Sequence, residues 1–123
     1  FYMGMNDDFP GDVSFGHRND AGSDGYTVTS ATAVQVINNQ FHHLAVVARD
    51  GTHRDIFIDG VFRTSVGSSV STSGPKTFTD SNIGVNQRNG SFAGYFQGII
   101  DQVRVYDIEL TTAQVQNIYN AQK

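Results

Sequence analysis

The sequence predicts an all-β protein with one short helix near its C-terminus. The 123 residues include 13 glycines and many Ser, Thr and Asn residues, a composition typical of a chain with many tight turns. Short runs rich in β-branched and aromatic residues recur between these turns, several of them with alternating apolar and polar positions. A single segment, after Leu110, has the apolar spacing of an amphipathic helix.

Length and composition exclude several classes of protein. At 123 residues with 38% hydrophobic content, residues 1–123 are expected to form one domain. The formal net charge of −4 and the lack of a Lys/Arg cluster predict no nucleic-acid partner, and no apolar run is long enough for a membrane span. The absence of cysteine excludes a disulfide framework, a thiolate metal site and a cysteine nucleophile. Because the chain opens at Phe1 in strand-like sequence, without an initiator Met or polar leader, we expect a fragment of a larger protein.

The first third of the chain predicts short strands separated by polar loops. Strands are expected at residues 1–5, 13–16 and 26–32, with residues 34–37 as a candidate continuation of the last. An acidic turn at residues 6–12 and a polar loop at residues 17–25 separate them.

The stretch FHHLAVVARDGTHRDIFIDGVFR, residues 41–63, predicts an antiparallel meander. Its strands are residues 41–48, 53–58 and 61–65. Asp59-Gly60 between two strand-like runs predicts a type I′ turn, because that turn needs a positive φ at both central residues. Asp50-Gly51 predicts a looser turn of the same kind.

The remaining β segments are expected at residues 77–85 and 92–106, after a loop at 66–76 and around a turn at 86–91. Phe78 and Ile83 are the predicted core residues of the first. In the second, Val103 and Val105 alternate with polar positions, and Arg104 and Tyr106 are expected to be cross-strand partners.

The helix is predicted from its N-terminal signals. Thr111 and Gln114 have the spacing of a capping box, and Leu110 and Val115 that of a hydrophobic staple. Val115, Ile118 and Tyr119 should share one apolar face, which docks the helix on a sheet.

An ordered set of motifs gives the sequence its family resemblance. The motifs are FHHLAVV (41–47), Asp50-Gly51, an apolar strand ending in Ile-Asp-Gly (58–60), Asn-Ile-Gly (82–84), FQGIIDQVRVY (96–106), the helix start LTTAQV (110–115) and IYNA (118–121). In this order they resemble the laminin G-like modules of the concanavalin A-like lectin/glucanase superfamily. The resemblance covers residues 40–121, and residues 1–39 fit loosely as the middle strands of the module.

The resemblance implies a jelly-roll β-sandwich with one concave and one convex antiparallel sheet. It also implies binding of carbohydrate or of extracellular proteins, as in cell adhesion, frequently with calcium. The family module usually carries further strands upstream, which either lie in a missing part of the polypeptide or are supplied by neighbouring chains that complete the sheet. Without them, residues 96–106 would form an exposed edge strand.

Asp101 is the leading metal candidate, because the resemblance implies that an aspartate at its position helps to hold a structural calcium together with backbone carbonyls. Calcium takes six to eight oxygen ligands, so one carboxylate with carbonyls and waters is chemically reasonable. The alternative is an aspartate that faces solvent or pairs with the helix end. Asp7 and Asp8 also concentrate oxygen ligands in the early acidic turn, where solvated turn residues are the default interpretation.

Two other patterns point away from zinc and from catalysis. His42 and His43 are neighbours on a predicted strand, so their side chains should point to opposite faces and not chelate one ion. Some superfamily members are glycoside hydrolases, which need two carboxylates about 5 to 9 Å apart. The one glutamate, Glu109, precedes the helix, and no second acid is expected beside Asp55 or Asp59, so the chain is predicted not to be an enzyme.

Carbohydrate binding commonly uses aromatic platforms with polar neighbours. The candidates are Tyr95, Arg88 and Asn86 around the turn at residues 86–91. With no Trp in the chain, these residues could equally belong to the rim of the core. The predicted function is a non-catalytic module of a secreted or virion-surface protein that binds a glycan or an extracellular protein. The alternatives are a structural subunit of a virion, filament or surface layer, and a degenerate glucanase.

Overall fold

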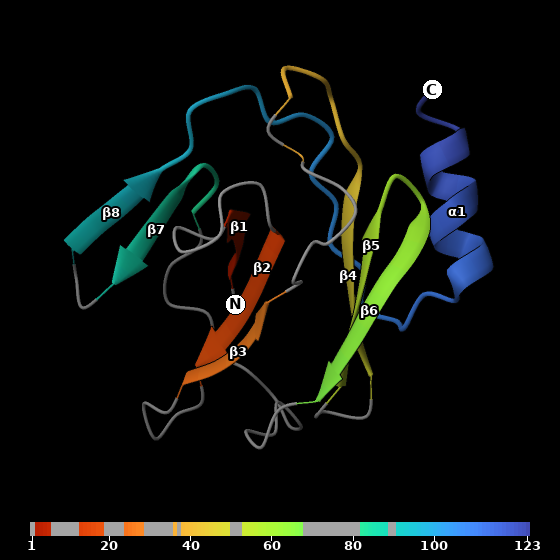
Figure 1. The fold of residues 1–123 in the computed structure, drawn as a ribbon, viewed down its shortest axis with the longest axis horizontal. Helices are drawn as coiled ribbons and strands as arrows, with labels where there is room; N and C mark the ends of the chain where they lie inside the picture. The colour runs from red at the N-terminus through yellow and green to blue at the C-terminus, as the bar shows by residue number, and fades with distance from the viewer. Residues whose placement is uncertain are drawn as a thin grey trace. The chain divides into compact units, whose positions relative to one another are not determined.

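The computed structural model describes residues 2–5, 13–18, 24–28, 36, 38–49, 53–67, 82–88 and 91–123. These ranges contain the strands β1 (Tyr2–Met5), β2 (Val13–Arg18), β3 (Asp24–Val28), β4 (Leu44–Arg49), β5 (His53–Ile58), β6 (Val61–Gly67), β7 (Val85–Arg88) and β8 (Ser91–Tyr95), and the helix α1 (Thr112–Asn120) (Figure 1). The strands pair antiparallel in three sheets, β1-β2-β3, β4-β5-β6 and β7-β8. The chain forms two compact units, which are described separately: Phe1–Ser73 with Ile108–Lys123, and Gly74–Asp107.

The predicted meander forms the central sheet of the first unit. Ile58 pairs with Val61 across the two-residue turn Asp59-Gly60. The turn residues have φ angles of 54° and 71°, as a type I′ turn requires, so this prediction is confirmed. On the other side, Arg49 pairs with His53, which makes β4 and β5 antiparallel; Asp50-Gly51 itself lies outside the described residues.

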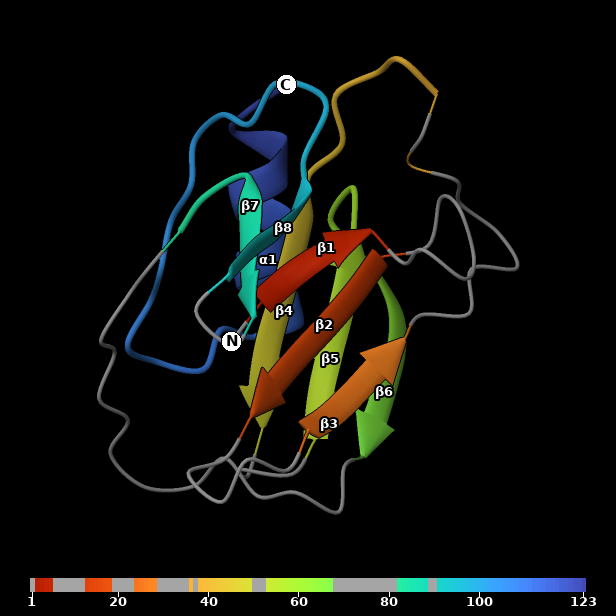
Figure 2. The ribbon, with the colours of Figure 1, turned by 90° about the vertical axis from the view of Figure 1, so that its left-hand side faces the viewer.

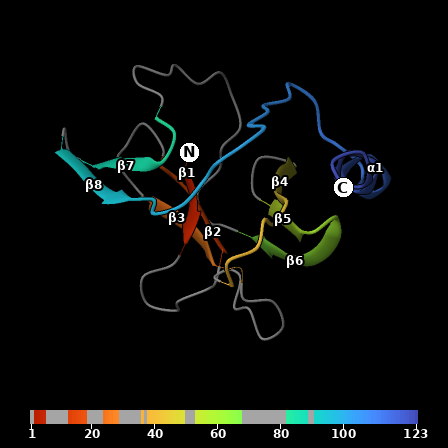
Figure 3. The same cartoon turned by 90° about the horizontal axis from the view of Figure 1, so that it is seen from above.

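One face of this central sheet packs toward the β1–β3 sheet. Leu44 and Ile58 pair directly across β4 and β5, and therefore point to the same face. There they pack in one cluster with Val13 of β2 and with Val36. Figures 2 and 3 show the β1–β3 sheet lying against this side of β4–β6.

The opposite face carries the helix. Phe57, the neighbour of Ile58, points the other way and packs with Val47 and with Val115 of α1. Figure 3 shows α1 on the far side of β4–β6 from the β1–β3 sheet. Because both faces are covered, Ile56, Phe57 and Ile58 are all buried in succession, where a half-exposed strand would alternate. Each such side chain contributes about 1.5–3 kcal/mol by leaving water.

The N-terminus of α1 confirms the predicted cap. Thr111 Oγ1 accepts from the Gln114 N–H at 3.2 Å, and the Gln114 side chain accepts from the Thr111 N–H at 2.8 Å. Leu110 packs against the cluster that contains buried Val115, as the predicted staple requires. Ile118 and Tyr119 are partly buried on the same side of the helix.

The second unit contains the hairpin β7–β8, and here two strand predictions are wrong. Residues 82–84 are not in a strand; Gly84 has a φ of 78° and β7 begins only at Val85. Ile83, predicted to be in the core, is 68% exposed. Phe78 and the rest of residues 77–81 lie outside the described residues.

The predicted long strand at residues 92–106 is also wrong beyond Tyr95, where β8 ends. Residues 96–106 join no sheet, because no strand of the described residues lies beside them to complete a hydrogen-bonded ladder. Arg104 donates instead to Gln102 Oε1 at 2.9 Å, and Gln102 adopts a φ of 52°, so neither Arg104 nor Tyr106 is a cross-strand partner. Val105, on the apolar side of the predicted alternation, is 93% exposed.

Other boundaries shift by a few residues. β2 continues to Arg18 and β3 begins at Asp24, so both enter the predicted polar loop. β4 begins at Leu44, and β6 runs to Gly67. Val36 is at a bend and not in a strand, and most of the predicted turn at residues 86–91 belongs to β7 and β8.

Candidate functional site

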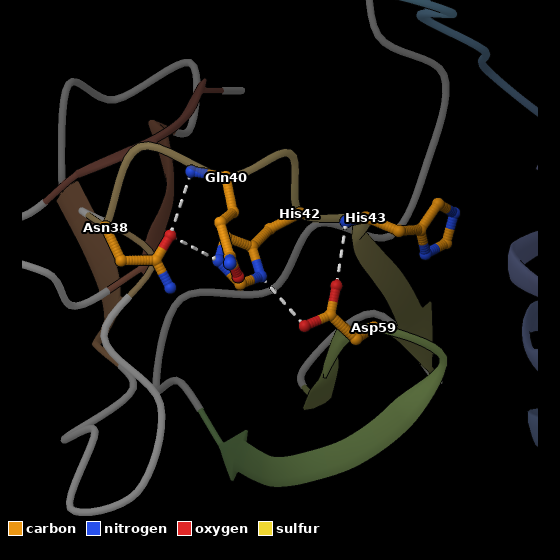
Figure 4. Close-up of polar contacts among 5 residues, drawn as sticks. All are labelled: Asn38, Gln40, His42, His43 and Asp59. Atoms are coloured by element: carbon orange, nitrogen blue, oxygen red, sulfur yellow. Dashed lines mark hydrogen bonds and ion pairs between the residues drawn. The ribbon is translucent and has the colours of Figure 1, made fainter. Parts of the chain in front are cut away.

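Asp59 is the centre of the most connected polar cluster among the described residues (Figure 4). Its carboxylate accepts from the backbone N–H of His43 at 3.1 Å and lies 2.8 Å from His42 Nδ1. Its own N–H donates to the His43 carbonyl at 2.8 Å, which extends the β4–β5 pairing by one residue. The turn that reverses the chain thus also holds the residues that lead into β4.

Asn38 extends this cluster on the other side of the His42 ring. Asn38 Oδ1 lies 3.0 Å from His42 Nε2 and accepts from the Gln40 N–H at 3.1 Å (Figure 4). The His42 side chain is only 11% exposed. Because both ring nitrogens have an oxygen partner, His42 does not present a free nitrogen to a substrate. We call Asn38, His42, His43 and Asp59 the Asp59 cluster. We interpret its role as structural, since its hydrogen bonds hold the residues that precede β4.

His43 points away from His42, as expected for neighbours in extended chain (Figure 4). Its ring centroid lies 5.9 Å from that of Tyr119 in α1. Tyr119 also carries the Lys123 ammonium 4.6 Å from its ring centroid, within the range of a cation–π contact. The histidine pair thus supports two different contacts and does not converge on one ion.

Arg49 contacts two acidic residues, Asp55 and Glu109, that are far apart in the sequence. Arg49 Nε donates to Asp55 Oδ2 at 2.8 Å, and Nη1 lies 3.6 Å from Glu109 Oε2. The hydrogen bond to Asp55, more than the smaller effect of Glu109, raises the pKa of the Arg49 guanidinium. The expectation that no second acid lies beside Asp55 is therefore corrected: Glu109 shares its guanidinium, because the segment leading into α1 crosses the helix-covered face of the sheet.

Of the three metal candidates, Asp101 is the one that lies in the described residues. Asp101 is exposed, and its Oδ1 accepts from the Gln102 N–H at 2.7 Å. Within the described ranges, no group of three or more His, Cys, Asp or Glu residues could hold a metal ion. Asp7 and Asp8 lie outside those ranges. Asp101 therefore remains a predicted calcium ligand, whose remaining ligands would be backbone carbonyls and waters.

The three ligand candidates all lie on the hairpin β7–β8. Asn86 pairs with Ala93, Arg88 with Ser91, and Tyr95 with Val85. The pairing skips Gly94, which has a φ of 62° and forms a β-bulge. Asn86 and Arg88 thus occupy one set of alternating positions of β7, whereas the partner of Tyr95, Val85, belongs to the other.

The bulge has a second consequence, which involves Phe92. Phe92 pairs with Gln87, and Gln87 lies two residues from Val85, the partner of Tyr95. Since alternate positions of a strand share a face, Phe92 and Tyr95 lie on the same face of the hairpin. They are 54% and 69% exposed. Without the extra residue they would point to opposite faces. We call Phe92 and Tyr95 the aromatic pair. The one sequence feature that pointed to their shared face is Gly94, because a glycine inside a strand often marks a bulge.

Comparison with known proteins identifies the family. A family model described as the concanavalin A-like lectin/glucanases superfamily, of laminin G type, matches residues 1–116. This chain belongs to that superfamily. The resemblance inferred from residues 40–121 is thereby confirmed and extended to residues 1–39, and the predicted antiparallel β fold with one C-terminal helix is confirmed with it.

A solved structure supports the superfamily fold. It is a 2.1 Å crystal structure of an S-layer domain-containing protein (residues 221–444) from Clostridium thermocellum ATCC 27405, with a TM-score of 0.52 and 18% sequence identity. The match covers 96% of this chain and 61% of the other, so the chain spans less than two thirds of that domain. At this identity the likeness shows the fold alone. No match was found among curated proteins.

The superfamily includes binding proteins and enzymes, and it is consistent with a surface or extracellular role. Among the described residues, no helix has both the length and the apolar character needed to cross a bilayer.

Proposed function

We propose that this chain is a non-catalytic module that binds carbohydrate at a cell or virion surface. The observation that carries the proposal is the aromatic pair, in which Phe92 and Tyr95 present two exposed rings on one face of the β7–β8 hairpin. Exposed apolar side chains that share one face, in contrast to single exposed residues, often mark a binding surface. The apolar faces of sugar rings stack on such side chains.

A polar group on the aromatic pair itself would supply specificity: the Tyr95 hydroxyl both donates and accepts hydrogen bonds, as sugar hydroxyls do. Asn86 and Arg88, the other two candidates, occupy the positions of β7 that alternate with Val85 and Gln87, the partners of the aromatic pair, so they are not part of this face. The ligand class is therefore a glycan, in preference to an extracellular protein.

The non-catalytic part of the proposal rests on how the carboxylates are occupied. Asp55 and Glu109 share the Arg49 guanidinium, and Asp59 is held by His42 and His43. A glycosidase needs one carboxyl group that carries a proton to the leaving oxygen and a second that is free to attack or to activate water. Acids already bound to cations and backbone N–H groups are poorly placed for either role.

Glycan-array screening followed by calorimetry on the best hit tests the proposal. Tyr95→Ala and Phe92→Ala should each weaken binding by about 5- to 30-fold, equivalent to about 1–2 kcal/mol of lost contact. Phe41→Ala is the matched control, because Phe41 is an equally exposed aromatic residue, 73% exposed, on another part of the chain. Undiminished binding by both hairpin variants would refute the proposed site.

Two further arms of that experiment address calcium and hydrolysis. Calcium would be bound by Asp101, with Asp7 and Asp8 as further candidate ligands, and glycan binding should then fall in EDTA and recover with added Ca²⁺.

Release of reducing sugar from the bound glycan would contradict the non-catalytic assignment. Loss of that release in Asp55→Asn and Glu109→Gln would identify the responsible acids.

A structural subunit of a surface assembly is the second candidate. The similarity to the S-layer domain-containing protein and the exposed apolar side chains of residues 96–106 favour it. No glycan bound with or without calcium, together with self-association, would support this role over carbohydrate binding.

A further inference from the structure

Gln87 is the residue of β7 that lies directly opposite Phe92 in the hairpin. Directly opposite residues of an antiparallel pair share a face, and their Cβ atoms lie about 4.5–5.5 Å apart. Val85 has the same relation to Tyr95. The face that presents the aromatic pair is therefore built at four positions, and Gln87 is the one amide among them.

This face carries no charged residue, although the hairpin contains one. Residues 85–95, VNQRNGSFAGY, include the single charged residue Arg88. Arg88 pairs with Ser91, one ladder position away from the pair of Gln87 and Phe92, so it belongs to the opposite face. An acidic glycan is recognised best by a cation that pairs with its carboxylates or sulfates. A face without a cation favours a neutral glycan.

The two aromatic residues are separated along the hairpin as well as sharing a face. Their partners Gln87 and Val85 are two residues apart on β7, which corresponds to about 6.5 Å of extended chain. A sugar ring stacked on Phe92 therefore leaves Tyr95 free to receive the next sugar of a chain. The spacing suits an oligosaccharide better than a single sugar.

An amide beside an aromatic ring is suited to the edge of a sugar. The glutamine side chain has two N–H donors and one carbonyl acceptor in a plane, so it can donate to one hydroxyl and accept from the neighbouring one. Stacking on an aromatic ring tolerates many sugars, whereas a pair of hydrogen bonds depends on how two adjacent hydroxyls are oriented. A sugar with the wrong orientation would leave polar groups unpaired.

We infer that Gln87 is a specificity-determining residue of the proposed glycan site, and that this site takes neutral oligosaccharides of at least two sugar units. Phe92 and Tyr95 stack on successive sugars, and the Gln87 amide binds two adjacent hydroxyls of the sugar on Phe92. Arg88 takes no part in selecting the ligand. This inference rests on the proposed carbohydrate-binding function.

An exchange of the residues at positions 87 and 88 tests the inference. The double variant Gln87→Arg/Arg88→Gln keeps the composition and the net charge, and moves the cation to the face of the aromatic pair. The readout is an array of neutral and uronic acid oligosaccharides of matched length, followed by calorimetry on the best hit. The unmodified chain should bind neutral oligosaccharides. The exchange should weaken that binding by about fivefold or more and strengthen binding of the uronic acid oligosaccharides by a similar factor.

Single variants separate the two positions. Gln87→Ala should weaken binding of the neutral oligosaccharide by about fivefold or more, because both hydrogen bonds are lost. Arg88→Gln is the matched control one position along the same strand, and should leave the Kd unchanged. Circular dichroism checks the fold of each variant. Gln87→Glu has nearly the shape of glutamine without its donors, so it should also weaken binding and gives a second reading if Gln87→Ala does not fold.

The outcomes distinguish this inference from the proposed function. Weaker binding by Phe92→Ala and Tyr95→Ala, with unchanged binding by the Gln87 variants, would overturn the inference and leave carbohydrate binding in place. Hits confined to uronic acid oligosaccharides, or equal effects of Arg88→Gln and Gln87→Ala, would overturn it in the same way. An unmodified chain that binds no glycan would overturn both.

Discussion

The Tyr119 ring lies directly over Gly60, so closely that a Cβ built on Gly60 would be 2.7 Å from Tyr119 Cδ1. Gly60 is buried and has a φ of 71°, so the turn needs glycine both for its backbone conformation and for space. The same turn therefore closes the β5–β6 hairpin and packs against the C-terminal part of α1.

Gly60→Ala should lower the free energy of unfolding by about 2–3 kcal/mol, from the left-handed backbone and from the contact with Tyr119. Chemical denaturation of Gly60→Ala in the natural background and in a Tyr119→Ala background separates the two causes. The substitution should cost less in the second background, where only the backbone strain remains. Equal costs in the two backgrounds would show that the ring does not limit the side chain at this position.

Asp59 should be more important for stability than an ordinary turn residue. Asp59→Ala removes the acceptor of the His43 N–H and of His42, and replaces a residue that tolerates positive φ, so we expect a loss of about 1–3 kcal/mol. Asp59→Asn keeps an oxygen acceptor and suits a type I′ turn, so it should cost clearly less. Thermal and urea unfolding of the two variants measure the difference, and a milder effect of alanine than of asparagine would contradict the role of the Asp59 cluster.

The cap of α1 gives a third test. Thr111→Ala removes the hydroxyl that accepts from the Gln114 N–H and should cost about 1 kcal/mol. Thr111→Ser retains the hydroxyl and is the matched control, with little expected change. Denaturation midpoints would detect the difference, and equal midpoints for the two variants would mean that the cap does not support the docked helix.

Arg49 should contribute a small stabilisation that does not vary with pH near neutrality. The pKa of its guanidinium is raised above its ordinary value, chiefly by the hydrogen bond to Asp55. A raised folded-state pKa gives stability that is complete below the unfolded value and is lost only as pH rises through the folded value. Arg49→Met should therefore lower stability by about 0.5–1 kcal/mol, since the ion pair is partly exposed. The Arg49 contribution to this loss should be equal at about pH 7 and pH 9.

Salt and a conservative variant provide the control for Arg49. The effect of Arg49→Met should shrink at high salt, because the contacts with Asp55 and Glu109 are screened. Arg49→Lys should recover part of the loss, since an ammonium is a point charge and cannot reach both carboxylates with the geometry of a guanidinium. Full recovery by lysine would mean that the second contact, with Glu109, adds nothing.

Local chemistry explains what could be predicted about individual elements. The Asp59-Gly60 turn, the capping box of Thr111 and Gln114 and the family motifs each depend on residues close together in the chain, and each is confirmed. The prediction failed for residues 96–106, whose β propensity is as high as that of β5. A strand needs a neighbour for its backbone hydrogen bonds, and nothing in the segment itself says whether that neighbour is present.

By itself, the sequence determined that this is an antiparallel β protein with one capped helix, because turns, caps and alternation are local. Its ordered motifs also resembled the concanavalin A-like superfamily, to which the chain belongs. Only the tertiary structure decided the contacts on which the candidate sites depend. Asp59 meets His42, and Glu109 meets Arg49, because strand register and helix docking bring distant residues together. Phe92 joins Tyr95 on one face because a single bulge at Gly94 changes the alternation of side chains. These are consequences of pairing between segments, and pairing is set by the whole fold.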